Sequence, residues 1–218
     1  SRHRMIIEQQ QAWQETYLNK ILSEHSSEMP IAPEVDEKIQ IYFSALIGNV
    51  PILISGEAGA GKLGVAKEVY RRREAYFRAR AGNSSTYHAE NKLTLIRVAT
   101  LPASPKEIEK TLDDELGMSE APAAALVRSP VIILDDIHVA SPAAQEVLCR
   151  KLDQFIPAGK PLGLDTSKAK FIFTTPPGLD AVVASGAFSA SLYSQISAFE
   201  IVCPPLRDRL SVPSDRDE

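Results

Sequence analysis

A glycine-rich segment between an apolar run and a helical pattern constrains this chain more than any other feature. The apolar run Ile52 to Ser55 has the length of a strand, and the loop Gly56 to Lys62 follows it directly. Val65, Ala66 and Val69 then recur at helical spacing. Strand, glycine-rich loop and helix in this order are the context of a phosphate-binding P-loop. The alternative interpretation is a glycine-rich turn that only joins a strand to a helix.

The chemistry of this loop suits an anion. Its glycines would let successive backbone N–H groups point inward, and the following helix would add the positive end of its dipole. Lys62 would reach the terminal phosphates of a nucleotide as a mobile charge. Leu63 stands where the motif usually has a hydroxyl residue, and an aliphatic side chain cannot ligate magnesium. The predicted nucleotide-binding residues are Gly56, Glu57, Ala58, Gly59, Ala60, Gly61, Lys62, Leu63 and Gly64.

A second unbroken apolar run, 131–134, ends in two acids, Asp135 and Asp136. Such runs are typical of central parallel strands, and ligands of open α/β sheets bind at the carboxyl ends of the strands. We therefore expect Asp135 to hold Mg²⁺, through water, and Asp136 to orient and help deprotonate an attacking water. The alternative is that both aspartates only cap the following helix. Thr174 and Thr175 end another strand, where they would sense a γ-phosphate, although threonine is also ordinary in strands.

The rest of the chain alternates strands and helices, which implies a mostly parallel sheet covered on both sides. Ser104 and Pro105, with Glu107 as the capping-box residue, predict a capped helix start, and Ser141 with Pro142 predicts a second capped start. The expected strands are 52–55, 93–98, 131–134, 170–175 and 199–203, and the expected helices are 5–25, 34–46, 62–80, 104–117, 142–155 and one from Leu179.

Composition narrows the class of protein. With 218 residues the chain has room for one α/β domain and an added helix, and a formal net charge of -4 gives no general attraction to nucleic acid. Arg71 to Arg73 are most simply a solvated basic face, with nucleic-acid contact as the alternative. Cys149 and Cys203 are expected to be buried thiols of a reducing compartment. No apolar run approaches the ~20 residues of a membrane span and no signal-peptide pattern begins the chain, so we expect a cytoplasmic protein.

Three stretches resemble one family. GEAGAGKLGVAKEVY after Ser55, ILDDIHVASPAAQEVLCRKLDQF around the two aspartates, and GAFSASLYSQISAFEIVCPPLRDR at 186–209 are similar to segments of bacterial enhancer-binding proteins, the AAA+ activators of sigma-54-dependent transcription. The resemblance runs from about Val50 to Arg209. It implies an AAA+ P-loop NTPase fold, with a parallel sheet of about five strands sandwiched by helices. It also implies ATP and Mg²⁺ as cofactors and a role in transcription regulation. We expect the chain to divide into an N-terminal amphipathic helix and linker (1–30), an ATPase core without the family's helical lid (31–209) and a polar tail (210–218).

The sequence also departs from that family. Nothing between Leu101 and Arg128 matches the family's GAFTGA loop, which grips the sigma factor. The positions of the arginine fingers fall near Ser189 and Gln195, and neither is basic. Pro176 occupies the place of the sensor asparagine, and the sequence contains neither the helical lid nor a DNA-binding motif. These departures argue against sigma-factor remodelling and against efficient hydrolysis, because an arginine finger accelerates hydrolysis by several powers of ten.

Three functions fit these observations. The first is an ATP-binding AAA+ module with weak or absent hydrolysis. The second is a working ATPase that assembles with itself or with an AAA+ partner, with Arg128, Arg207, Arg209 or a partner's arginine in place of the fingers. The third is a non-enzymatic interaction module that keeps the fold and contacts a protein partner through Trp13 and Tyr17 of the N-terminal helix. Direct DNA binding and membrane attachment are not expected.

Overall fold

The computed structural model describes residues 31–81, 93–116, 130–155 and 169–210. Its sheet runs in the order β2-β3-β4-β1-β5, and every neighbouring pair is parallel. The prediction of a parallel sheet of about five strands is therefore confirmed. The strand before the glycine-rich loop, β1, lies between β4 and β5. The strands are β1 (Ile52–Ser55), β2 (Leu93–Arg97), β3 (Val131–Asp135), β4 (Lys170–Thr175) and β5 (Glu200–Val202).

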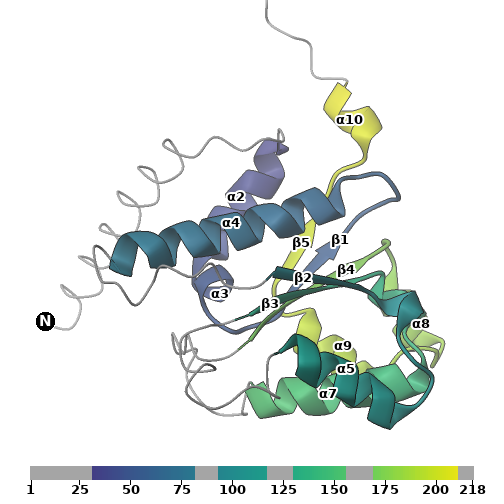
Figure 1. Cartoon of the computed structure of the whole chain (residues 1–218). Coiled ribbons are helices and arrows are strands. Elements are labelled where there is room, and N and C mark those ends of the chain that lie inside the picture. The colour runs from purple at the N-terminus through teal and green to yellow at the C-terminus, as the bar shows by residue number, and fades with distance from the viewer. Residues whose placement is uncertain (1–30, 82–92, 117–129, 156–168, 211–218) are drawn as a thin grey trace, which may run out of the picture.

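Helices cover both faces of this sheet (Figure 1). One face carries α2 (Pro33–Ile41), α3 (Phe43–Ile47) and α4 (Lys62–Ala81). The other carries α5 (Pro105–Glu115), α7 (Pro142–Phe155) and α9 (Ala190–Ile196), with α8 (Leu179–Ala184) packed beside α9. Two 3-10 turns, η2 (Val98–Thr100) and η3 (Ile137–Val139), follow β2 and β3, and α10 (Leu206–Leu210) follows β5. The layers are those of an α/β/α sandwich.

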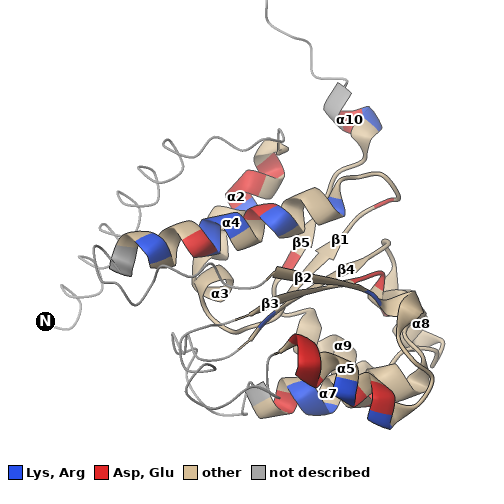
Figure 2. Cartoon of the chain, viewed as in Figure 1, with Lys and Arg blue, Asp and Glu red and all other residues tan. Residues whose placement is uncertain are grey.

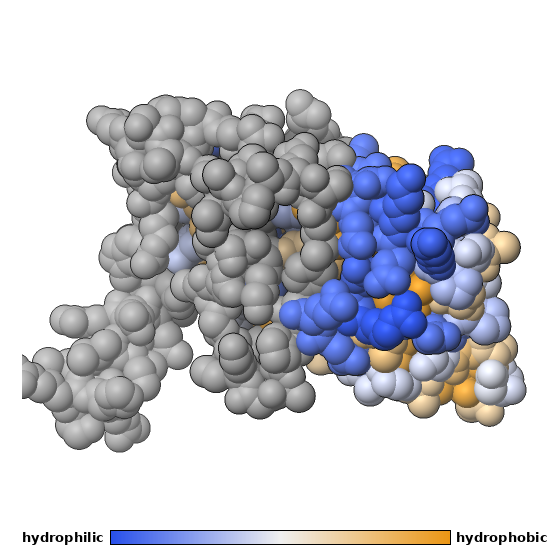
Figure 3. All heavy atoms as spheres, turned by 60° about the horizontal axis from the view of Figure 1, so that its bottom comes forward, coloured by the Kyte–Doolittle hydropathy of each residue, from blue (hydrophilic) through white to orange (hydrophobic). Residues whose placement is uncertain are grey.

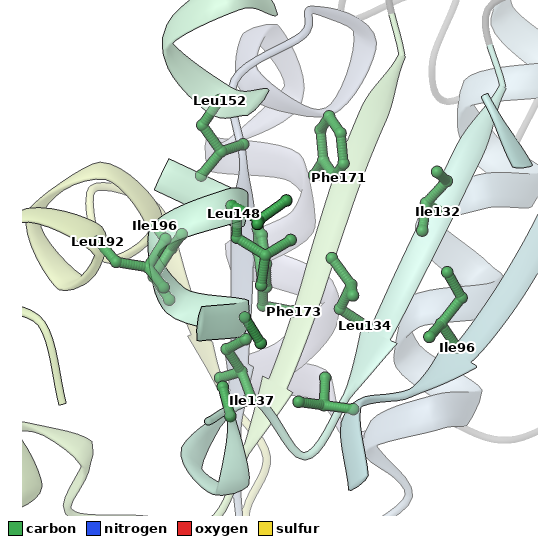
Figure 4. Close-up of a cluster of buried hydrophobic side chains, with 14 of the residues drawn as sticks. Ile96, Ile132, Leu134, Ile137, Leu148, Leu152, Phe171, Phe173, Leu192 and Ile196 are labelled. Carbon is green, nitrogen blue, oxygen red and sulfur yellow. The ribbon is translucent and has the colours of Figure 1, made fainter. Parts of the chain in front are cut away.

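The central strands are buried on both faces, which explains why their sequences are unbroken apolar runs. Below the sheet in Figure 1, Leu134 and Phe173 meet Leu148 of α7 and Ile196 of α9 in one hydrophobic cluster (Figure 4). A second cluster joins the opposite face to α2, α3 and α4. On the α5 and α7 side, hydrophilic side chains cover most of the outer surface that the structure describes, with smaller hydrophobic areas beside them (Figure 3).

Local signals explain most helix boundaries. Ser141 Oγ accepts a hydrogen bond from Ala144 N at 3.2 Å, so the predicted cap of α7 is confirmed. Ser104 and Pro105 begin α5 as predicted, but the Ser104 side chain makes no capping hydrogen bond, so that part of the prediction is wrong. The single helix expected over 34–46 is divided into α2 and α3 at Tyr42. The helix α9 was not predicted.

The arginine run of α4 differs from the prediction. The side chain of Arg73 has 0% exposed area and that of Arg72 has 9%, so these two are not a solvated face. Arg72 pairs with Asp36 of α2 and, at 2.8 Å, with Glu68 of its own helix. Arg71 pairs with Glu68 as well. Acidic residues on α2 and α4 thus neutralise the run, and Figure 2 shows red and blue segments side by side on these helices.

Lys170 is a fully buried cation at the start of β4. Its Nζ donates hydrogen bonds to the carbonyl oxygens of Ala45, in α3, and Val50, just before β1. Burial lowers the pKa of the Lys170 ammonium well below its ordinary value, and the positive charge of Arg73 lowers that pKa further. The contact connects the N-terminal ends of β4 and β1, which lie side by side in the sheet.

The two cysteines differ in burial. Cys203 is buried as expected, but Cys149 is partly exposed and its Sγ lies 3.4 Å from Ser191 Oγ, so the expectation of a buried thiol is wrong there.

The helix expected over 5–25, with Trp13 and Tyr17, lies outside the described residues, as do the tail from 211 and Arg128. Of the helices that the structure describes, none combines the length and apolar character that crossing a membrane requires.

Candidate functional site

The sheet brings the predicted site residues to one edge. Ser55 at the end of β1 pairs with Thr175 of β4, and Leu134 of β3 pairs with Phe173 of β4. The glycine-rich loop follows β1 and the two aspartates stand at the end of β3, so they lie on either side of β4. Strands are spaced by ~4.8 Å, so the ends of β1 and β3 are about 10 Å apart. This is the carboxyl edge, where ligands of open α/β sheets bind.

The loop after β1 has the backbone geometry of an anion cradle. Gly59 and Gly61 have φ angles of 79° and 84°, which glycine adopts far more readily than other residues. Ala60 N donates to Glu57 O at 3.1 Å and closes the turn. Val65 N donates to Gly61 O at 3.0 Å, which is the first hydrogen bond of α4. The helix thus begins directly at the loop and turns its positive end toward it.

Lys62 lies folded back on this loop. Its Nζ donates to Gly56 O at 2.9 Å and to Glu57 O at 3.0 Å. An ammonium group has three donors on a flexible stem, so a phosphate can replace these carbonyl contacts without moving the backbone. Leu63, by contrast, packs against the hydrophobic cluster between the sheet and α4. Its side chain is a core contact, which leaves only its backbone for the loop.

The neighbouring residue Cys203 leaves no room for a side chain at position 56. A Cβ added at Gly56 would lie 2.9 Å from Cys203 Cβ and 3.0 Å from Cys203 O. Cys203 N also donates to Ser55 O at 2.7 Å, and Gly56 N donates to Thr175 O at 3.2 Å. The first residue of the loop is therefore fixed between the ends of β4 and β5. No signal in the sequence pointed to this role of the segment after β5.

The two aspartates have different environments. Asp135, at the end of β3, is partly buried, and its Oδ1 accepts a hydrogen bond from Thr174 Oγ1 at 2.6 Å. Asp136 is exposed, and its backbone is left-handed, with φ 59° and ψ 54°. Its N–H donates to the same Thr174 Oγ1 at 2.9 Å. One hydroxyl of β4 therefore positions both acids.

The alternative that the aspartates cap the next helix is not supported. Asp136 precedes the 3-10 turn η3 without a side-chain capping bond, and α7 begins only at Pro142, where Ser141 is the cap. The two threonines at the end of β4 are buried. Thr174 acts on the site through the aspartates, whereas Thr175 Oγ1 has no hydrogen-bond partner among the described residues.

One of the arginines that could replace the fingers, Arg207, contacts the loop of its own chain. From α10 it donates to both carboxylate oxygens of Glu57, at 2.7 and 2.9 Å. Ser189 instead caps α9, accepting from Leu192 N at 3.3 Å. Gln195 donates to Asp153 of α7 at 2.7 Å. The two positions near which the resemblance places the arginine fingers thus contribute to the start of α9 and to its contact with α7.

Comparison with curated proteins finds transcriptional regulators. The chain is 29% identical over 172 residues to a Nif-specific regulatory protein of Rhodobacter capsulatus, an alignment that covers 75% of this chain and 27% of that protein. It is 28% identical over 171 residues to the transcriptional regulatory protein XylR of Pseudomonas putida, covering 75% of this chain and 28% of XylR. The chain thus spans between a quarter and a third of the length of these relatives. No family model matches the sequence.

Comparison with solved structures finds the same fold. NtrX from Brucella abortus in complex with ATP superposes with a TM-score of 0.53 at 21% identity, covering 94% of this chain and 43% of NtrX. The ORC2 protein of Aeropyrum pernix, in ADPNP and ADP complexes, gives a TM-score of 0.51 at 20% identity, covering 81% and 50%. The sheet order, the geometry of the loop and the similarity to these regulators all agree with the resemblance found in the sequence. This chain is related to the AAA+ domains of the bacterial enhancer-binding proteins, the sigma-54-dependent activators, as its sequence motifs predict.

Proposed function

We propose that this chain is a cytoplasmic ATP-binding AAA+ module that acts in transcription regulation, with weak or absent hydrolysis. The observation that supports ATP binding is the loop itself. Gly59 and Gly61 have positive φ angles, α4 begins at Lys62, and the Lys62 ammonium rests on carbonyls of the same loop. The loop therefore offers backbone N–H groups, a helix dipole and a mobile cation to one anion.

The residues at the edge of the sheet fit Mg²⁺ that arrives with the nucleotide. In the part of the chain that the structure describes, no three His, Cys, Asp or Glu side chains gather as a metal site. Mg²⁺ is commonly held by one or two carboxylates together with waters and phosphate oxygens, which suits Asp135 at the end of β3. Leu63 removes the usual hydroxyl ligand, so Asp135 would be the principal protein contact. The ion would neutralise charge on the phosphates.

The proposal of weak hydrolysis follows from the arginines. Ser189 caps α9 and Gln195 contacts Asp153 of α7, and neither side chain can supply a cation to a neighbouring subunit. Arg207 is bound to Glu57 of its own chain. Without an arginine at the γ-phosphate, hydrolysis would be slower by about three to five powers of ten.

Calorimetric titration with ATP tests the proposal. Wild type should bind ATP, with Mg²⁺ increasing the affinity, and Lys62→Ala should weaken binding at least tenfold because a charge-assisted contact to phosphate is lost. Lys67→Ala is the matched control, since Lys67 is an exposed lysine on the same helix. A wild-type protein without measurable ATP binding, or equal losses in the two variants, would refute the proposal.

A second candidate is a working ATPase that assembles with itself or with an AAA+ partner, and the backbone of Asp136 favours it. A left-handed non-glycine residue is uncommon, and such strain gathers at functional sites. Asp136 also exposes its carboxylate at the edge where the phosphates would lie. If this candidate is correct, phosphate release per protomer should rise with protein concentration or on adding the partner, and Asp136→Asn should abolish it. Background rates at every concentration, unchanged in Asp136→Asn, would exclude it.

A further inference from the structure

Glu57 places a negative charge beside the proposed site for an anion. Its carbonyl oxygen accepts from Ala60 N at 3.1 Å and from Lys62 Nζ at 3.0 Å, so its backbone is part of the cradle. Its side chain is 46% exposed beside that cradle. An uncompensated carboxylate at this position would repel the phosphates of an approaching nucleotide, because like charges a few ångströms apart interact measurably even in water.

Arg207 neutralises this carboxylate across 150 residues of sequence. Nη1 lies 2.7 Å from one carboxylate oxygen and Nη2 lies 2.9 Å from the other. This two-point arrangement matches the planar guanidinium fork and is more specific than a single ion pair. The hydrogen bond to Arg207 lowers the pKa of Glu57 and the same bond raises the pKa of Arg207, so both groups are charged near neutral pH.

The backbone holds Arg207 where it can make this contact. Gly56, which precedes Glu57, packs directly against Cys203, and Ser55 O accepts from Cys203 N at 2.7 Å. Pro204 and Pro205 then restrict the chain before α10 begins at Leu206. The loop and α10 are thus joined twice, once through the backbone at Cys203 and once through the ion pair. Figure 2 shows charged segments on the loop after β1 and on α10 at the same end of the molecule.

We propose that Arg207 is a positioning residue of the nucleotide site: it neutralises Glu57 at the entrance of the cradle and couples nucleotide affinity to the placement of α10. This inference rests on the proposed ATP binding. Arg207 acts on the nucleotide through Glu57, so its importance depends on the carboxylate being present. That dependence separates this role from an arginine that touches the phosphates itself.

A double-mutant cycle on the full chain tests the inference, with ATP affinity in the presence of Mg²⁺ as the readout. Arg207→Ala should bind ATP about fivefold more weakly than wild type, the size expected for one exposed and partly screened charge. Arg207→Lys should recover part of the loss, because it keeps the charge without the fork. Glu57→Gln combined with Arg207→Ala should restore the affinity to within about twofold of wild type. The loss in Arg207→Ala should also shrink at high salt.

The outcomes separate the explanations. Arg207→Ala with wild-type affinity would overturn the inference and leave ATP binding intact. A double variant as weak as Arg207→Ala would overturn it as well, because Arg207 would then act on the phosphates directly. A wild-type protein that binds no ATP would overturn the proposed function, and the inference with it. Because the pair is exposed, the unfolding midpoint of Arg207→Ala serves as a folding control, and we expect it to stay near that of wild type.

Discussion

Thr174 offers the sharpest test of how the candidate site is built. Its hydroxyl donates to Asp135 Oδ1 at 2.6 Å and accepts from Asp136 N at 2.9 Å, while its side chain is fully buried in β4. Thr174→Val keeps the shape of the side chain and removes only these two hydrogen bonds. Thr174→Ser keeps the hydroxyl and removes a methyl group, so it is the matched control.

The expected loss of stability in Thr174→Val follows from the two hydrogen bonds of the hydroxyl. The bond to the Asp136 N–H is neutral and contributes about 1 kcal/mol, whereas a bond to a carboxylate contributes about 1.5–3 kcal/mol. Asp135 is partly exposed, so water replaces part of the lost bond and the lower end of that range applies. We expect Thr174→Val to lower the free energy of unfolding by about 2–3 kcal/mol. Thr174→Ser should lower it by about 1 kcal/mol, the value of one buried methyl group.

Denaturant titration followed by circular dichroism measures both values, and nucleotide binding measures the effect on the site. Thr174→Val should lose ATP affinity more strongly with Mg²⁺ than without it, because Asp135 is the residue left without orientation. If Thr174→Val is as stable as Thr174→Ser, the Thr174 hydroxyl does not hold the two aspartates, and the assigned role of β4 in positioning them is wrong.

Four further substitutions probe the loop and the rest of the fold. Gly56→Ala should destabilise the fold by about 1–3 kcal/mol, because the new Cβ would lie 2.9 Å from Cys203 Cβ, whereas Gly59→Ala meets no atom within 4 Å and should cost about 1–2 kcal/mol through its left-handed backbone alone. Leu192→Ala, fully buried in α9, should lower the free energy of unfolding by about 2–5 kcal/mol in the same titration. For Lys170 the folded pKa is lowered, so between that pKa and the unfolded value of ~10.4 the unfolded chain holds one more proton. The free energy of unfolding should therefore rise with pH in that window, by up to ~1.4 kcal/mol per pH unit, and Lys170→Met should remove that contribution; an unchanged slope in the variant would contradict the assignment.

Much of the fold could be predicted because its signals are local. The strands β1, β3 and β4 are buried on both faces, and burial of this kind leaves unbroken apolar runs that are visible in the sequence. The glycine-rich loop could be predicted for a similar reason, since its strand, glycines and lysine are contiguous in the chain. The helix α9 has a weaker signal, consisting of the cap Ser189 and two buried positions one turn apart, Leu192 and Ile196. It has only seven residues, too few to be stable alone, so its packing on α7 decides its conformation.

The pairings across the sequence could not be predicted. Arg72 and Arg73 look like a solvated face in the sequence because nothing local shows that α2 supplies Asp36. Glu57 and Arg207 are separated by 150 residues. Contacts of this kind depend on the placement of whole elements, and periodicity contains no information about that placement.

The candidate site is held together by β4 more than by its own loop. Thr175 O accepts from Gly56 N at 3.2 Å on one side, and Thr174 Oγ1 contacts both aspartates on the other. These hydrogen bonds join the loop to β4 and the aspartates to β4, and none of them joins the loop to the aspartates. The distance between the two halves is therefore set by the one strand between them. A shift of the β4 backbone at Thr174 and Thr175 should disturb both halves together, whereas loss of the Thr174 hydroxyl alone should disturb only the aspartates. A change in the loop should leave the aspartates in place. Loss of Mg²⁺-dependent binding without loss of binding to the phosphates is thus the expected signature of damage on the β3 side of β4.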